Sequence, residues 1–154
     1  MNVSVMIGKF DNLRPNHIED GTKREWLSAL ETLQIIEVVT THEIPDWIAG
    51  HETYLKFVET NGRGTLFDDS SDGELLIPEP YATDVYYWWL AAKTDLIEGN
   101  TDKYQNDMQL YNNAMLTYKD WYNRTYKPLQ LARSFMRGET KVNVFTRTET
   151  DQQK

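Results

Sequence analysis

Histidines and their neighbours are the first candidates for chemistry in this sequence. There are three of them, His17, His42 and His51. A glutamate directly follows two of them, at Glu43 and Glu52. No two histidines stand four residues apart, the spacing that places a pair of metal ligands on one face of a helix. The sequence therefore predicts no metal site, and nothing in it calls for a cofactor.

Other catalytic patterns are missing as well. The absence of cysteine excludes thiol nucleophiles, disulfides and cysteine-based zinc sites. Gly62-Arg63-Gly64 lacks the rest of a nucleotide-binding fingerprint, and no serine occupies a G-x-S-x-G turn. We predict that the chain is not an enzyme. A small acid–base or metal-dependent hydrolase stays open as an alternative that no residue supports.

Length and charge limit the remaining choices. The 154 residues, 40% of them apolar, suffice for one core and one domain. No apolar run approaches the ~18–20 residues of a membrane span, and residues 1–5 do not resemble a secretory leader, so we expect an intracellular protein. The net charge of −8 is uneven, because residues 128–154 hold five basic and three acidic side chains, a net of +2.

Apolar spacing predicts four helices, over residues 3–13, 22–40, 80–98 and 102–126. The last two are separated by only three residues, so they must form an antiparallel hairpin. In the predicted fourth helix, large side chains spaced alternately four and three residues apart form a heptad seam. They are Tyr104, Met108, Tyr111, Met115, Tyr118 and Tyr122. The seam is either a core stripe or has tyrosine tips that reach a subunit boundary.

Eight side chains are predicted to be buried between the second, third and fourth helices. They are Trp26, Leu30, Leu33, Val85, Trp88, Met108, Tyr111 and Met115.

Two segments are predicted to be extended. Strand-forming residues on both sides of Asn61-Gly62 indicate a β-hairpin over about residues 53–67. After Pro128, the alternation around Val142 and Val144 indicates a strand that has no partner nearby in the sequence. We therefore divide the chain into a helical domain with a hairpin insertion, residues 1–128, and a C-terminal arm, residues 129–154.

Several motifs between residues 75 and 128 resemble those of one known family. They are Leu75-Leu76-Ile77-Pro78-Glu79-Pro80-Tyr81, Tyr86-Tyr87-Trp88, Gly99, Tyr104-Gln105-Asn106 and Trp121-Tyr122-Asn123-Arg124-Thr125-Tyr126-Lys127-Pro128. Arg14-Pro15-Asn16 and the helix start at Lys23-Arg24-Glu25-Trp26-Leu27 match its opening. The chain resembles the head–tail connector, or adaptor, proteins of tailed bacteriophages and prophages over residues 1–128, except residues 46–72.

The resemblance implies a mainly α fold, a four-helix adaptor-type bundle, here with the hairpin insertion and the extended arm. Such adaptors are structural virion proteins of the neck, assembled in the host cytoplasm. They form a ring, usually of twelve copies, under the portal protein. The ring extends the DNA channel and is a docking platform for a neck, tail or stopper protein. Contact with the packaged double-stranded DNA would be non-specific, and no membrane is involved.

Two sets of contact residues are predicted on that basis. Tyr54, Phe57 and Phe67 of the hairpin would contact a neighbouring subunit or a neck protein. An extended arm can add its backbone to another chain. The portal-binding residues of the arm would be Arg133, Phe135, Met136, Arg137, Lys141, Val142, Val144, Phe145 and Arg147. The alternative is a helical protein–protein interaction module with no role in a virion.

Overall fold

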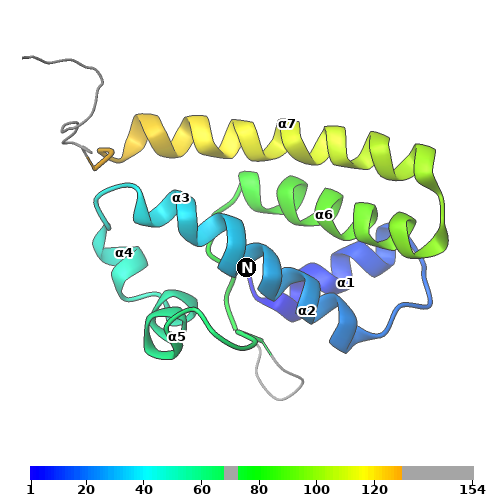
Figure 1. Cartoon of the computed structure of the whole chain (residues 1–154), viewed down its shortest axis with the longest axis horizontal. Coiled ribbons are helices and arrows are strands. Elements are labelled where there is room, and N and C mark those ends of the chain that lie inside the picture. Colours follow the sequence, from blue (N-terminus) through cyan, green and yellow to red (C-terminus); the bar gives the residue numbers. More distant parts are fainter. Residues whose placement is uncertain (68–72, 130–154) are drawn as a thin grey trace, which may run out of the picture.

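The computed structural model describes residues 1–67 and 73–129, and this part of the chain is helical and contains no β-strand. The helices are α1 (Val3–Leu13), α2 (Asp20–Leu30), α3 (Ile36–Thr40), α4 (Asp46–Ala49), α5 (Glu52–Thr60), α6 (Tyr81–Glu98) and α7 (Thr101–Thr125). One turn of π-helix, Glu31–Ile35, joins α2 to α3, so that these three elements form one long rod (Figure 1). The predicted mainly helical class is confirmed.

The α6–α7 hairpin forms as its spacing predicted. Gly99 ends α6 with a φ of 79°, a left-handed conformation that costs glycine little, and the amide of Asn100 returns to the Asp95 carbonyl at 2.9 Å. The chain then reverses, and the two helices lie side by side (Figure 1). Four residues of the heptad seam are buried: Tyr111, Met115, Tyr118 and Tyr122. The seam is therefore mainly a core stripe.

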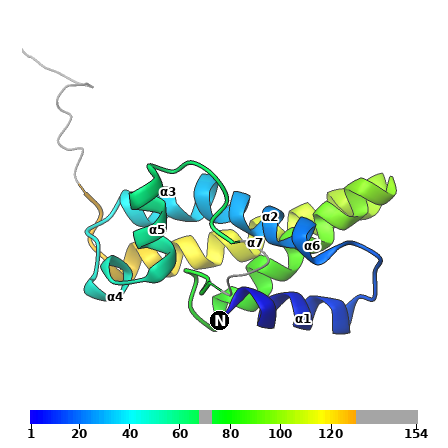
Figure 2. The same cartoon turned by 90° about the horizontal axis from the view of Figure 1, so that it is seen from below.

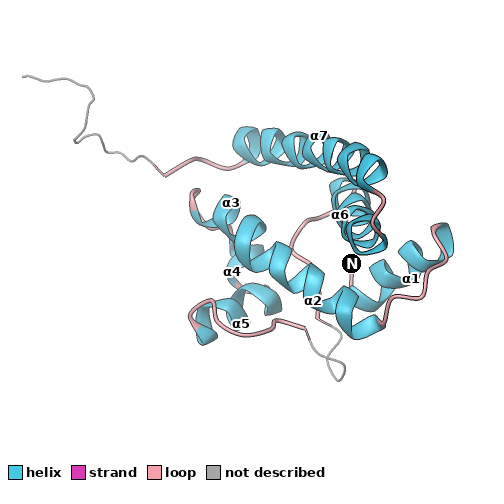
Figure 3. Ribbon diagram, turned by 45° about the vertical axis from the view of Figure 1, so that its right-hand side comes forward, coloured by secondary structure: helices cyan, strands magenta, loops and turns pink. Residues whose placement is uncertain are grey.

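The other helices cover the remaining sides of α6. Helix α1 lies on the side of α6 away from α7, and α2 packs against both α1 and α6 (Figures 1 and 3). The core between them contains five fully buried apolar side chains. They are Met6 and Phe10 of α1, Leu27 and Leu30 of α2, and Val85 of α6. Of the predicted core residues, Trp26, Trp88 and Met108 are only partly buried, while Trp89 is the buried tryptophan.

Leu33 is the one clear error in the predicted core, because its side chain is 71% exposed. It lies in the π-helical turn, where an extra residue changes the direction of the side chains. Steps of three residues from Leu27 and Leu30 lead to Leu33, whereas the buried residues of this turn are Glu31, four residues after Leu27, and Ile35.

The predicted β-hairpin over residues 53–67 is wrong. Residues 52–60 form α5, and residues 61–67 are a loop that returns along α2 (Figure 2). Asn61 and Gly62 do adopt positive φ angles, 55° and 75°. They end a helix there, since the Gly62 amide donates to the Phe57 carbonyl at 2.9 Å. The Asn-Gly pair correctly indicated left-handed backbone, but it could not show whether a strand or a helix came before it.

Candidate functional site

Helix α5 holds two of the three predicted hairpin contact residues. His51 caps the helix, because its side chain accepts the Thr53 amide at 3.2 Å. Tyr54 and Phe57 are partly buried against the core, so they face inward. The exposed apolar side chains of α5 are instead Leu55 and Val58, each 52% exposed. An outward contact of α5 would therefore be made by residues that the sequence did not single out.

Phe67, the third predicted contact residue, cannot reach a partner, because it is 1% exposed. Its loop is tied to the body, since the Leu66 amide donates to Ser28 Oγ at 2.8 Å and Lys56 Nζ donates to the Leu66 carbonyl at 2.8 Å. A Cβ added at Gly73 would meet the Phe67 ring at 2.9 Å, which shows how closely the chain approaches that ring. The end of the loop, Leu66 and Phe67, is thus part of the core.

The start of the C-terminal arm is anchored to the corner between α3 and α4. The Leu129 amide donates to the Thr41 carbonyl at 2.9 Å, and the Glu43 amide donates to the Lys127 carbonyl at 2.9 Å. Trp47 Nε1 donates to the Tyr126 hydroxyl at 2.8 Å. These bonds determine where the chain leaves the helices. All nine predicted portal-binding residues, from Arg133 to Arg147, lie outside the described residues.

His42 lies at the same corner and has a structural role. Its Nδ1 is 2.8 Å from the Val38 carbonyl oxygen, and its Nε2 is 2.6 Å from the side-chain oxygen of Asn123. The ring also meets Tyr122 edge-on, with the centroids 4.8 Å apart. Both nitrogens therefore have polar partners, so His42 offers none to a metal. It borders a hollow of about 260 Å³ that Glu37 and Lys119 also line.

A fully buried carboxyl group, Glu31, links the rod to α6. Glu31 accepts the Tyr86 hydroxyl at 2.6 Å and the Leu76 amide at 2.9 Å, and the Tyr86 hydroxyl accepts the Ile77 amide at 3.1 Å. Burial raises the pKa of Glu31 to about 7, although both hydrogen bonds oppose the rise. It also raises the pKa of Tyr86. The network joins three segments, and the side chains of Glu31 and Tyr86 are fully buried in it.

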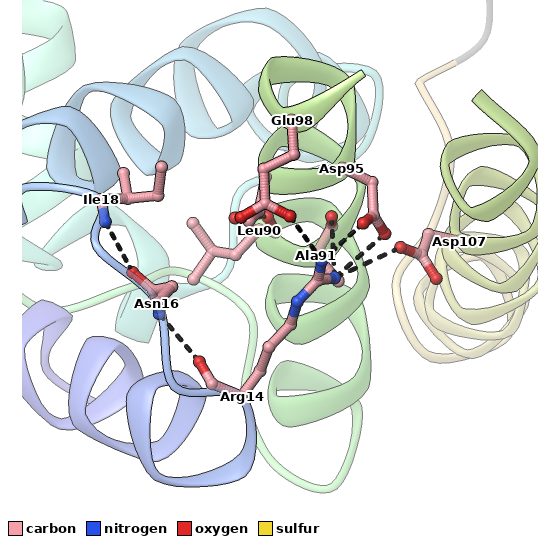
Figure 4. A network of polar contacts seen from close by, with 9 residues as sticks. Arg14, Asn16, Ile18, Leu90, Ala91, Asp95, Glu98 and Asp107 are labelled. Atoms are coloured by element: carbon pink, nitrogen blue, oxygen red, sulfur yellow. Dashed lines mark hydrogen bonds and ion pairs between the residues drawn. The ribbon is translucent and has the colours of Figure 1, made fainter. Parts of the chain in front are cut away.

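A second polar cluster joins α1, α6 and α7 (Figure 4). Arg14 Nη1 donates to Asp95 at 3.0 Å and lies 3.7 Å from Asp107, and Glu98 is 3.6 Å from Nη2. The hydrogen bonds from Arg14 lower the pKa of Asp95 to about 2. Burial, followed by the hydrogen bond and charge of Asp95, raises the pKa of Asp107 to about 7. At neutral pH the Asp107 carboxyl is therefore partly protonated, whereas Asp95 beside it is ionised next to the guanidinium.

The sequence did not single out either cluster. Glu31 directly follows Leu30 on the apolar stripe that includes Leu27. A carboxylate at such a position is the sequence signal that could have indicated this buried cluster. The predicted hairpin brings residues 95 and 107 near each other, but the three-residue link does not show that both carboxyl groups face Arg14 from α1.

The described residues contain no group of three histidine, aspartate or glutamate side chains that could hold a metal ion. None of the helices in residues 1–67 and 73–129 is both long and apolar enough to cross a membrane. A comparison of the chain with protein-family models, with curated proteins and with solved structures found no match.

Proposed function

We propose that this chain is a structural head–tail connector of a tailed bacteriophage. In this proposal, copies of the chain form a ring beneath the portal, twelve as is usual for such adaptors, in the neck of the virion. The ring extends the DNA channel and is a platform for the next neck, tail or stopper protein. The proposal rests on the resemblance of residues 1–128 to that family.

One observation carries the proposal: four aromatic residues of the resembling motifs, Tyr81, Trp121, Tyr122 and Tyr126, meet in one cluster. Tyr81 stacks on Trp121 with ring centroids 5.1 Å apart, and Tyr122 and Tyr126 are 4.7 Å apart. Tyr86 lies in the same α6–α7 hairpin and binds Glu31. The resemblance therefore describes how a helical hairpin packs on its neighbours, as expected for a shared architecture.

The arrangement of the long elements is compatible with the four-helix adaptor-type bundle. Its four helices would be α1, the rod of α2 and α3, α6, and α7. Helix α5 and the loop that follows it occupy the place of the predicted hairpin insertion.

The charge of the helical domain also supports a channel protein. Residues 1–127 hold twenty-one acidic and eleven basic side chains, a net of −10. Duplex DNA is bound tightly where clustered lysine and arginine neutralise its phosphates, so an acidic domain lets DNA pass without gripping it. The net charge of +2 in residues 128–154 has the opposite sign and suits a separate docking role. In this proposal the arm binds the portal.

Native mass measurement with purified portal protein tests the proposal. The wild-type chain should bind the portal as a ring, and a chain truncated after Pro128 should keep its helices but lose this binding. A double variant, Arg133→Glu with Arg137→Glu, should bind at least about tenfold more weakly, a loss of about 1.4 kcal/mol.

A matched control changes the same charges on the helical domain. Lys103→Glu with Arg124→Glu alters two exposed positions of α7 and should leave portal binding unchanged. Binding that survives truncation would show that the arm does not dock. A chain that stays at 18.1 kDa with the portal present would favour the alternative, an interaction module with no role in a virion.

A further inference from the structure

The outward face of α7 is uncharged over more than three helical turns. The exposed side chains between residues 105 and 117 are Gln105, Asn106, Gln109, Asn112, Asn113, Leu116 and Thr117. Leu116 is 58% exposed and lies on the same side as Gln109, opposite the buried seam. We call this stretch the amide face. At 1.5 Å per residue it is about 20 Å long.

The amide face differs from the rest of the helical surface. Charged residues make up 26% of the chain, and exposed carboxylates lie on Glu25 of α2, Glu59 of α5 and Asp84 of α6. Depletion of charge marks the central part of protein interfaces, whereas ordinary solvent-exposed helix surface carries charges of both signs. The amide face therefore has the composition of a contact surface.

Helix α1 has a second face of this kind. Along its outward side lie Val5, which is 50% exposed, Gly8 and Asn12, with the charged Lys9 beside them, and the carboxylate of Asp11 is partly exposed and paired with Lys23. A Cβ placed at Gly8 would have nothing within 4 Å, so the backbone is open to a close approach there. Helices α1 and α7 lie on opposite sides of α6 (Figures 1 and 3), so the two faces point away from each other.

We propose that the amide face of α7 packs against the outward face of α1 in a second copy of the chain. Two different faces of one molecule make a head-to-tail contact, and repetition of such a contact gives a closed ring when the rotation between successive copies closes. Each copy has a net charge of −8, so copies repel each other except where they meet through uncharged surface. This proposal rests on the part of the proposed function in which copies of the chain associate.

The size of the contact predicts how the ring assembles. A face about 20 Å long on a helix about 10 Å wide covers roughly 200 Å², well below the ~800 Å² that each partner of a stable pair buries. A single pair of copies is therefore weak. In a closed ring every copy makes the contact twice, so closure stabilises the assembly and partial rings are rare.

Cross-linking between single cysteines tests the contact directly, because the chain has no cysteine of its own. Gly8→Cys places a thiol on α1 where nothing obstructs it, and Gln109→Cys places one at the centre of the amide face. Equal amounts of the two variants, concentrated and treated with a short bismaleimide, should give the mixed dimer. Either variant alone should give little product.

The matched control is Gly8→Cys mixed with Thr125→Cys, an exposed position of α7 beyond the amide face. The Gln109 mixture should give at least about tenfold more mixed dimer than this control, the factor that 1.4 kcal/mol of preferential contact produces. In addition, Asn113→Glu should weaken self-association, because it puts a charge in the contact, and Thr125→Glu should not.

Equal cross-linking in the two mixtures would overturn the proposed contact, whatever the oligomeric state of the sample. A ring that forms and binds portal without the Gly8–Gln109 cross-link would refute this contact but leave the connector function in place. If the chain gives the Gly8–Gln109 cross-link but does not bind portal, the contact between copies stands and the connector function is refuted.

Discussion

The α6–α7 hairpin and the α4–α5 segment are held in the molecule by different kinds of interaction. The hairpin buries aromatic and apolar side chains along its length, among them Trp89, Tyr111 and Tyr118. The α4–α5 segment buries only Ile48 and Thr53 within its two helices. It is tied to the body by polar bonds, such as the one from the Thr53 hydroxyl to the Glu74 carbonyl. The hairpin is therefore a scaffold, whereas α4 and α5 are attached to it.

This difference predicts how much each region contributes to stability. Burial of apolar surface contributes about 25 cal/mol per Å², and a buried aromatic ring covers ~150–250 Å². A single hydrogen bond contributes only about 0.5–1.5 kcal/mol net. Substitutions in the hairpin should therefore cost several times more than substitutions in α5.

The largest effect is expected for Trp89→Ala in α6. Trp89 is 8% exposed, packs on Tyr111 with centroids 5.2 Å apart, and donates to the Trp26 carbonyl. Its removal should lower the free energy of unfolding by about 3–5 kcal/mol in urea denaturation. Leu116→Ala on the exposed side of α7 is the control and should cost less than about 1 kcal/mol. Similar losses for both would remove the distinction between the two sides of the hairpin.

The next effect is a dependence of stability on pH. Glu31 and Asp107 both have pKa values raised to about 7, so the folded chain holds protons there that the unfolded chain has released. Their contribution is complete below pH ~4 and disappears as the pH rises through ~7. The free energy of unfolding should fall by on the order of 2 kcal/mol for each of the two groups between about pH 5 and pH 8.

Asp107→Asn identifies the source of this dependence. The amide cannot ionise, so the variant should be more stable than the wild type at about pH 8 and should lose less stability between about pH 5 and pH 8. Thermal melting at several pH values measures both. An unchanged pH profile would show that Asp107 is not protonated in the folded chain.

A smaller effect is expected in α5. Thr53→Val keeps the shape of the side chain but removes the hydroxyl that binds the Glu74 carbonyl, and the loss should be about 1–2 kcal/mol. Thr40→Val at the exposed end of α3 is the control, since its hydroxyl binds only within the helix, to the Ile36 carbonyl. If Thr53→Val cost as much as Trp89→Ala, α5 would belong to the scaffold.

The smallest effect is expected for Leu55→Ser on the outer side of α5. Because the Leu55 side chain is half exposed, its replacement should change the free energy of unfolding by about 0.5 kcal/mol or less in the isolated chain. Urea denaturation of the dilute protein measures it, with Val58→Ser as a parallel case. A loss above about 1 kcal/mol would mean that the outer face of α5 is covered in solution.

The same two regions show what could be predicted from the sequence. The hairpin was predictable because its signals are local: a heptad seam, a glycine at the turn and a three-residue link. The fold of residues 53–67 was not, since Tyr54, Phe57 and Val58 favour a strand by local propensity, whereas the chain forms a helix there. Contacts from distant residues, Ser28 with Leu66 and Glu74 with Thr53, accompany the helical outcome.

The polar clusters mark the same limit. The sequence by itself determined a mainly helical chain, the α6–α7 reversal and an acidic surface. Helical periodicity and turn residues act between near neighbours in the chain, and net charge depends on composition alone. Only the tertiary structure decided that Glu31 meets Tyr86 fifty-five residues away, and that Arg14 meets Asp95 and Asp107. The pKa values of these carboxyl groups depend on burial and on neighbours from other helices, and neither exists until the helices pack.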